Sequence, residues 1–177
     1  MSALRDALAA VSSDVELFGG NRIGESGRSF SIKKVRRGDE VVAALFDLGG
    51  ERGNGGLRCD ALFLCRAAGE LRVTPVFVEL KGSHTGHAVR QIKESVRHVC
   101  KNTSGSHDRL QAETTANSRH GGRVLGLVVA RKGLSLRQVE QKTLCEQGIR
   151  LKIVSVPKGK PVVKKCSELH RLLHSGS

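Results

Sequence analysis

The chain has 177 residues, 38% hydrophobic and 27% charged, a balance typical of a single globular domain (1–177) with a real core and unlike that of a disordered chain. Its 30 Lys and Arg outnumber its 17 Asp and Glu by 13, which favours a polyanionic partner, nucleic acid, over a merely solubilising surface. No apolar run reaches the roughly 18 residues of a membrane span, and the first residues lack the apolar core of a secretory signal. We therefore expect a cytoplasmic protein with no membrane partner.

The first half of the chain predicts a short helix, a loop and a series of strands. Apolar spacing predicts the helix at residues 2–11, and the Gly-rich polar stretch 18–27 is typical of a loop. Arg36-Arg37-Gly38-Asp39 is typical of a hairpin connection between two β runs. The predicted strands are residues 30–35, 41–48, 57–64 and 73–80.

The second half alternates helices and strands. The clearest helix is 86–100, and the polar stretch 101–122 predicts a long mobile loop. The elements expected after it are a buried strand at 123–130, a helix at 135–147, an outer strand at 149–156, and a basic linker and terminal helix within 158–177. Strands that first meander and then alternate with helices predict an α/β fold, a mixed β-sheet flanked by helices.

The positive charge and the cysteines are informative through their distribution. Residues 1–60 hold nine basic and nine acidic side chains, so residues 61–177 carry the whole excess of 13. The five cysteines include no CxxC pair, which argues against a zinc site or a disulfide framework, and we interpret them as small buried residues. The chain also lacks the GxxxxGK[ST] and GxSxG patterns of phosphate-binding loops and serine hydrolases.

Two neighbouring predicted strands each carry an acid where an apolar residue is expected. Asp60 interrupts the first, and Glu79 lies near the end of the second with Lys81 two residues on. Residues two apart in a strand share a face, so a hairpin can place Asp60 beside Glu79 and Lys81. Asp60, Glu79 and the carbonyl of Leu80 would suit Mg²⁺ or Mn²⁺, and Lys81 would hold or activate an attacking water. The alternative is an ion pair on a solvated sheet face.

At these residues the chain resembles the PD-(D/E)xK nuclease superfamily. Asp60 matches the first acid of the family pattern, Glu79 the second, and Lys81 the lysine. Cys59 stands where the family commonly has proline. The resemblance implies a restriction-endonuclease-like fold and a catalytic set of Asp60, Glu79 and Lys81.

The order of the predicted elements agrees with this resemblance. The helix at 86–100 and the strand at 123–130 follow the motif as in the family's αβββαβ core. The resemblance covers roughly residues 1–131, and the rest is expected to decorate that core.

Two further site residues are suggested by the family. Many members carry another acid early in the chain, for which Glu25, in a Gly-flanked stretch, is the leading candidate and Asp14, Glu16 and Asp47 are alternatives. Some branches carry a Gln in the helix after the motif, with a Tyr four residues later. Gln91 matches that Gln, but Ser95 occupies the Tyr position. A solvated loop Glu and a helix-surface Gln are the alternatives.

Basic side chains near the motif are candidates for nucleic-acid contacts. One side of the 86–100 helix gathers four of them, Arg90, Lys93, Arg97 and Lys101. His84 and His87 lie at the mouth of the expected site, although a helix start exposes such side chains anyway. A second cluster, a clamp on the backbone or a soluble linker, consists of Lys158, Lys160, Lys164 and Lys165.

The resemblance implies a Mg²⁺-dependent endonuclease that hydrolyses phosphodiester bonds in DNA, in restriction, phage defence or repair. The scarcity of aromatic residues favours duplex or branched DNA over single strands, and the family suggests a homodimer. Two alternatives stay open. The chain could be an inactive nuclease-fold module that binds nucleic acid or a protein, or a basic RNA-binding protein unrelated to nucleases.

Overall fold

The structure is a computed structural model. It describes residues 4, 15–18, 20–25, 27–46, 58–80, 85–102, 124–130, 144, 148–157 and 159–174. These residues form two β-sheets and two helices in a mixed α/β arrangement, as the sequence predicts at this level. None of the helices described is long and apolar enough to cross a membrane.

The larger sheet has six strands in the order β1-β4-β5-β6-β7-β8. Their bounds are β1 Val15–Phe18, β4 Glu40–Phe46, β5 Ala61–Arg66, β6 Thr74–Leu80, β7 Val124–Ala130 and β8 Ile149–Ser155. Pairing is antiparallel from β1 to β6 and parallel from β6 to β8. The sheet is therefore mixed, and β8 is an outer strand, as its alternating sequence predicts.

The smaller sheet joins two segments far apart in the chain. β2 (Arg22–Glu25) pairs antiparallel with β3 (Arg28–Lys33), and β3 pairs in parallel with β9 (Pro161–Lys165). Gly27 has a φ of 74°, a conformation that glycine adopts without strain, and it lies in the tight β2–β3 turn.

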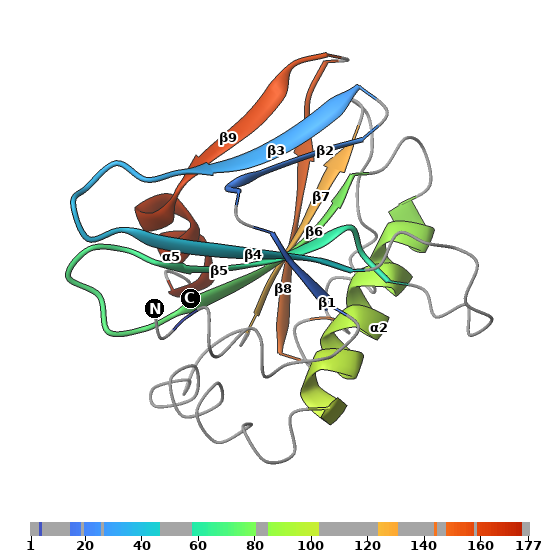
Figure 1. Ribbon diagram of the computed structural model, residues 1–177. Helices are drawn as coiled ribbons and strands as arrows, with labels where there is room; N and C mark the ends of the chain where they lie inside the picture. Colours follow the sequence, from blue (N-terminus) through green and yellow to red (C-terminus); the bar gives the residue numbers. More distant parts are fainter. Residues whose placement is uncertain are drawn as a thin grey trace.

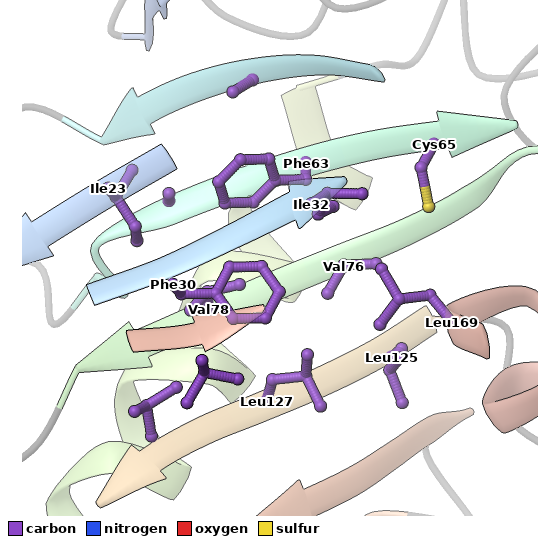
Figure 2. Close-up of a cluster of buried hydrophobic side chains, with 14 of the residues drawn as sticks. Ile23, Phe30, Ile32, Phe63, Cys65, Val76, Val78, Leu125, Leu127 and Leu169 are labelled. Atoms are coloured by element: carbon purple, nitrogen blue, oxygen red, sulfur yellow. The ribbon is translucent and has the colours of Figure 1, made fainter. Parts of the chain in front are cut away.

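Each face of the larger sheet has its own hydrophobic core. On one face, Leu62 and Phe77 pack with α2 (Thr85–Asn102) through its buried stripe, which includes Ile92. On the other face, the smaller sheet and α5 (Cys166–His174) cover the strands (Figure 1). Figure 2 shows Phe30 of β3 beside Phe63 of β5, and the two rings are in an edge-to-face contact with centroids 5.4 Å apart. The molecule thus has three layers, with the larger sheet in the middle.

Glycine allows α2 to pack closely on the sheet. A Cβ at Gly126 of β7 would lie 2.6 Å from Leu151 Cδ1 and 3.1 Å from Ile92 Cγ2. Both distances are shorter than ordinary van der Waals contact. Gly126 therefore sets how closely the helix approaches the strands.

Two predictions for the first half of the chain are wrong. The stretch 18–27 contains the end of β1 and all of β2, because pairing with β3 and burial of Ile23 outweigh a Gly-rich composition. Residues 36–39 do not close a hairpin, since β3 and β4 belong to different sheets. They form a connection between the sheets.

The last part of the chain is not a decoration. Residues 161–165, predicted as linker, form β9, because their backbone pairs with β3. β9 and α5 also supply Val162, Leu169 and Leu173 to the core beneath the smaller sheet. The predicted helices at 2–11 and 135–147 lie outside the described residues except Leu4 and Leu144, and the predicted loop 101–122 does so except for its first two residues, which end α2.

Candidate functional site

The strand register places Asp60 opposite Glu79. β5 and β6 are antiparallel, with Ala61 opposite Val78 and Leu62 opposite Phe77. One step beyond the Ala61–Val78 pair, Asp60 therefore comes opposite Glu79. Both acids are two residues from members of the Leu62–Phe77 pair, so they lie on the face that α2 covers.

The sequence predicts Asp60 inside a strand, but in the structure it lies just before β5. The physical reason is a hydrogen bond, in which the Leu80 N–H donates to Asp60 Oδ2 at 2.6 Å. A side-chain oxygen thus receives the N–H at the end of β6, and β5 begins one residue later. This bond fixes the Asp60 carboxylate beside the backbone that links Glu79 to Leu80.

The two carboxylates are shielded from water to different degrees. Glu79 is only 1% exposed, and Asp60 is half-buried. Burial raises the pKa of the neighbouring Cys59 thiol well above its ordinary value, and the negative charges of Glu79 and Asp60 raise it further. Both acids are therefore near enough to act on one thiol. Neighbouring carboxylates away from water repel each other, and a cation beside them lowers that cost.

Two side chains of α2 hold the segment that precedes Asp60. Gln91 Nε2 donates to the carbonyl of Arg58 at 2.8 Å, and the N–H of Cys59 donates to Ser95 Oγ at 2.8 Å. Gln91 and Ser95 are four residues apart and so share one helix face. The sequence analysis does not predict this anchoring role of Ser95, which it treats only as a departure from the Tyr of the family pattern. The feature that could have indicated the role is a small polar residue on the apolar side of the helix, where Ser95 is fully buried.

The basic side of α2 is only partly available for a ligand. Arg90 is exposed and Lys93 half-buried, and among the described residues neither forms an ion pair. Arg97 Nη1 lies 2.6 Å from Glu94 Oε1, with both side chains about half exposed. Such an exposed pair is weak, so Arg97 can exchange Glu94 for a phosphate. Lys101 lies in the last turn of the same helix.

Not every predicted site residue lies near the acid pair. Glu25 ends β2 in the smaller sheet, which covers the opposite face of the larger sheet from α2. His87 is half-buried in the first turn of α2. Lys81 and His84 lie outside the described residues, as do the alternative acids Asp14 and Asp47. Glu16 lies on β1, where its backbone pairs with that of Leu45 on β4. Leu45 is followed by Phe46, the last residue of β4, and then by Asp47.

The donor set suits a hard divalent cation that keeps much of its water. Asp60, Glu79 and the neighbouring Leu80 carbonyl offer oxygen ligands, the type that Mg²⁺ and Mn²⁺ prefer. Within the described ranges there is no group of three or more His, Cys, Asp or Glu side chains placed to hold a metal ion. Mg²⁺ commonly uses one or two carboxylates with waters and phosphate oxygens, so two acids are sufficient for it.

Comparison of the chain with protein-family models, with curated proteins and with solved structures finds no match in any of the three. Its chemistry is therefore inferred from its own residues and their placement.

Proposed function

We propose that the protein is a Mg²⁺- or Mn²⁺-dependent nuclease that hydrolyses phosphodiester bonds in DNA, with the restriction-endonuclease-like fold and a cytoplasmic location. The observation that carries the proposal is the Asp60–Glu79 pair, on adjacent strand ends and joined through the Leu80 N–H. This is the placement that the family resemblance requires of its two acids.

Asp60 and Glu79 would hold the metal, with the Leu80 carbonyl as a further ligand. A bound Mg²⁺ would supply positive charge to the scissile phosphate and acidify a bound water. The fixed position of Asp60, held by Leu80 on one side and by the Gln91 and Ser95 anchors on the other, reduces the reorganisation needed when substrate arrives.

Lys81 follows Leu80 directly and is proposed as the positioning group for the attacking water or the charged phosphate. Its ammonium would also offset part of the repulsion between Asp60 and Glu79. Arg90, Lys93 and Arg97 follow on α2 and would hold the phosphates that flank the cleaved bond.

Duplex or branched DNA is the proposed substrate, because the chain has only five Phe and no Tyr or Trp for stacking on unpaired bases. Symmetric cutting of both strands would require two active sites, and we propose a homodimer for that reason. Restriction, phage defence and repair are all compatible with this activity.

The decisive experiment is a cleavage assay with the full chain on plasmid, linear duplex, branched duplex, single-stranded DNA and RNA, in Mg²⁺, Mn²⁺ or EDTA. Cutting should require metal, and Asp60→Asn and Lys81→Ala should each lower its rate roughly 100-fold or more. Equal rates for wild type and both variants would refute the assignment.

A matched control is Glu40→Gln, which also removes one negative charge but lies at the start of β4, in a half-exposed pair with Arg66. Its rate should equal that of the wild type. If no substrate is cut while DNA binding persists, the inactive binding module becomes the better description.

A further inference from the structure

The outer face of the smaller sheet gathers positive charge from distant parts of the chain. Strand alternation turns Ile23, Phe30 and Val162 toward the core and leaves Arg22, Lys33 and Lys165 on the outer, exposed face. The β3–β4 connection adds exposed basic residues at the end of β3. We call this surface the β3–β9 basic face, and its members are Arg22, Lys33, Lys34, Arg36, Arg37 and Lys165.

Like charges are adjacent on this face. Lys33 and Lys165 are direct partners in the parallel β3–β9 register, at the spacing of neighbouring strands. Like charges opposite each other on one sheet face are destabilising. Among the described residues, none of the six members forms an ion pair, whereas Lys164, which alternates to the other side, pairs with Glu168 at 2.5 Å. Asp39 offsets part of the charge of Arg36, but no ion pair compensates Lys33 and Lys165 within the described part of the chain.

The connection that carries three of these residues is firmly held. Asp39 Oδ2 accepts the N–H groups of Val35 and Arg36 at 2.8 and 3.0 Å, and Oδ1 accepts that of Ala68 at 2.8 Å. The last bond ties the connection to the β5–β6 turn. The basic side chains are thus presented from a fixed backbone, which lowers the entropy lost when they bind a ligand.

We propose that the β3–β9 basic face binds the phosphate backbone of duplex nucleic acid, as a second surface separate from the Asp60–Glu79 site. The negative charge of bound phosphates would offset the repulsion between Lys33 and Lys165, and the release of counterions from the nucleic acid would favour binding. The face has a half-buried hydroxyl donor at Ser31 but no aromatic side chain on its outward positions, so it suits phosphates rather than unstacked bases.

The basic face and the acid pair lie on opposite sides of the larger sheet. α2 lies on one side of the larger sheet and the smaller sheet covers the other side (Figure 1). The acid pair is on the α2 side, whereas the basic face points away from the larger sheet. A straight duplex at the acid pair could not also lie on the basic face. The second surface would therefore hold a second segment of the substrate or a second duplex. The inference rests on the proposed function only for the choice of nucleic acid as partner.

The test measures binding of a short blunt-ended duplex in EDTA by fluorescence anisotropy, over about 50 to 200 mM salt. The variant Lys33→Gln/Lys165→Gln should reduce the slope of log affinity against log salt by about two and weaken binding roughly tenfold or more at low salt. The matched control, Arg72→Gln/Lys152→Gln, removes two positive charges elsewhere, between β5 and β6 and on β8, and should keep the wild-type slope.

Removing the Lys33–Lys165 repulsion should leave the unfolding temperature unchanged or raise it. If the double variant fails to fold, Arg36→Gln/Arg37→Gln tests the same face from the connection. A slope equal to that of the control would overturn the inference. The inference is also overturned if the double variant binds the duplex as well as the wild type does but no longer binds vesicles that contain phosphatidylserine, because the face would then recognise lipid headgroups.

The experiments distinguish failure of the nuclease proposal from failure of the second binding surface. Binding in EDTA with the expected loss of slope, but no cleavage, would reject the nuclease and keep the second surface. Metal-dependent cleavage with an unchanged slope would keep the nuclease and reject the second surface.

Discussion

The acid pair beneath α2 and the β3–β9 basic face carry opposite charges on opposite sides of the larger sheet. The first places Asp60 and Glu79 opposite each other at the neighbouring ends of β5 and β6, which are consecutive antiparallel strands. The second joins residues 22–37 to residues 161–165 through β3 and β9. Each gathers like charges, and each would be stabilised by a ligand of the other sign, a cation at the acids and phosphates at the basic face.

This contrast suggests different roles for the two regions, fixed geometry at the acid pair and added affinity at the basic face. Glu79 is buried, and Asp60 is half-buried and held by the Leu80 N–H, as suits a site whose geometry must be fixed. The lysines and arginines of the basic face are exposed on long side chains, as suits contacts that add affinity without positioning a reacting bond. Substitutions that disturb one region should therefore leave the other largely intact.

The largest stability effect is expected at Asp39, which holds the basic connection. Asp39→Asn replaces one of two accepting carboxylate oxygens by an NH₂ group that cannot accept, and should cost about 2 kcal/mol of unfolding free energy at neutral pH. Burial alone would raise the pKa of Asp39, but the N–H groups of Arg36, Val35 and Ala68 outweigh it and hold that pKa below its ordinary value. Chemical denaturation over a range of pH measures the effect.

The sign of the pH dependence follows from the lowered pKa. Because the folded-state pKa of Asp39 is below the unfolded-state value, its stabilisation is complete above about pH 4 and is lost as the pH falls through the folded-state pKa. The gap between wild type and Asp39→Asn should therefore close in acid. Glu40→Gln, in a half-exposed ion pair, should cost at most about 1 kcal/mol. A gap that is constant with pH would contradict this account.

A smaller effect on the opposite side is expected from Gly126→Ala. The added methyl group meets Leu151 and Ile92 and should push α2 outward, at a cost of about 1 to 2 kcal/mol. Cleavage should fall with it, because the anchors Gln91 and Ser95 move with the helix, while the salt slope due to the basic face is kept.

Thermal unfolding compares Gly126→Ala with Gly86→Ala, where a Cβ meets nothing within 4 Å. Gly86→Ala near the start of α2 should be neutral or slightly stabilising, because it reduces the freedom of the unfolded chain. Equal effects of the two substitutions would show that α2 is not packed closely on β7.

The smallest effect is expected at Gln91. Gln91→Ala removes the hydrogen bond to the Arg58 carbonyl and should cost about 1 kcal/mol, with a severalfold lower cleavage rate because Asp60 is held less firmly. Glu94→Ala, on the exposed side of the same helix, should change stability by less than about 0.5 kcal/mol. Stability and single-turnover cleavage are measured on both. An unchanged cleavage rate for Gln91→Ala would limit Gln91 to a structural role.

Where local pattern coincided with local structure, the sequence predicted the elements well. The strands near 73–80, 123–130 and 149–156 and the helix at 86–100 are confirmed, because period and burial in these runs follow from their own residues. The closeness of Asp60 to Glu79 was also predictable, since consecutive antiparallel strands need only a turn between them to bring their ends together.

The errors have two different causes. β2 pairs locally with β3, but its loop-like composition conceals the hairpin. β9 resembles a basic linker and becomes a strand because it pairs with β3, which lies far earlier in the chain. Ser95 shows the same effect for a side chain, since its partner is the N–H of Cys59, 36 residues earlier. Local propensity is a weak guide to such positions because tertiary hydrogen bonds and burial outweigh it.

The sequence by itself determined the mixed α/β class, the positive charge and the acid pair on two consecutive strands. Only the tertiary structure decided which lysines share a surface and which side chains anchor Asp60. The physical reason is that strand alternation and charge count depend on neighbouring residues. The pairing of β3 with β9 and the packing of Ile92 of α2 on Gly126 depend on groups more than 30 residues apart, which meet only in the folded chain.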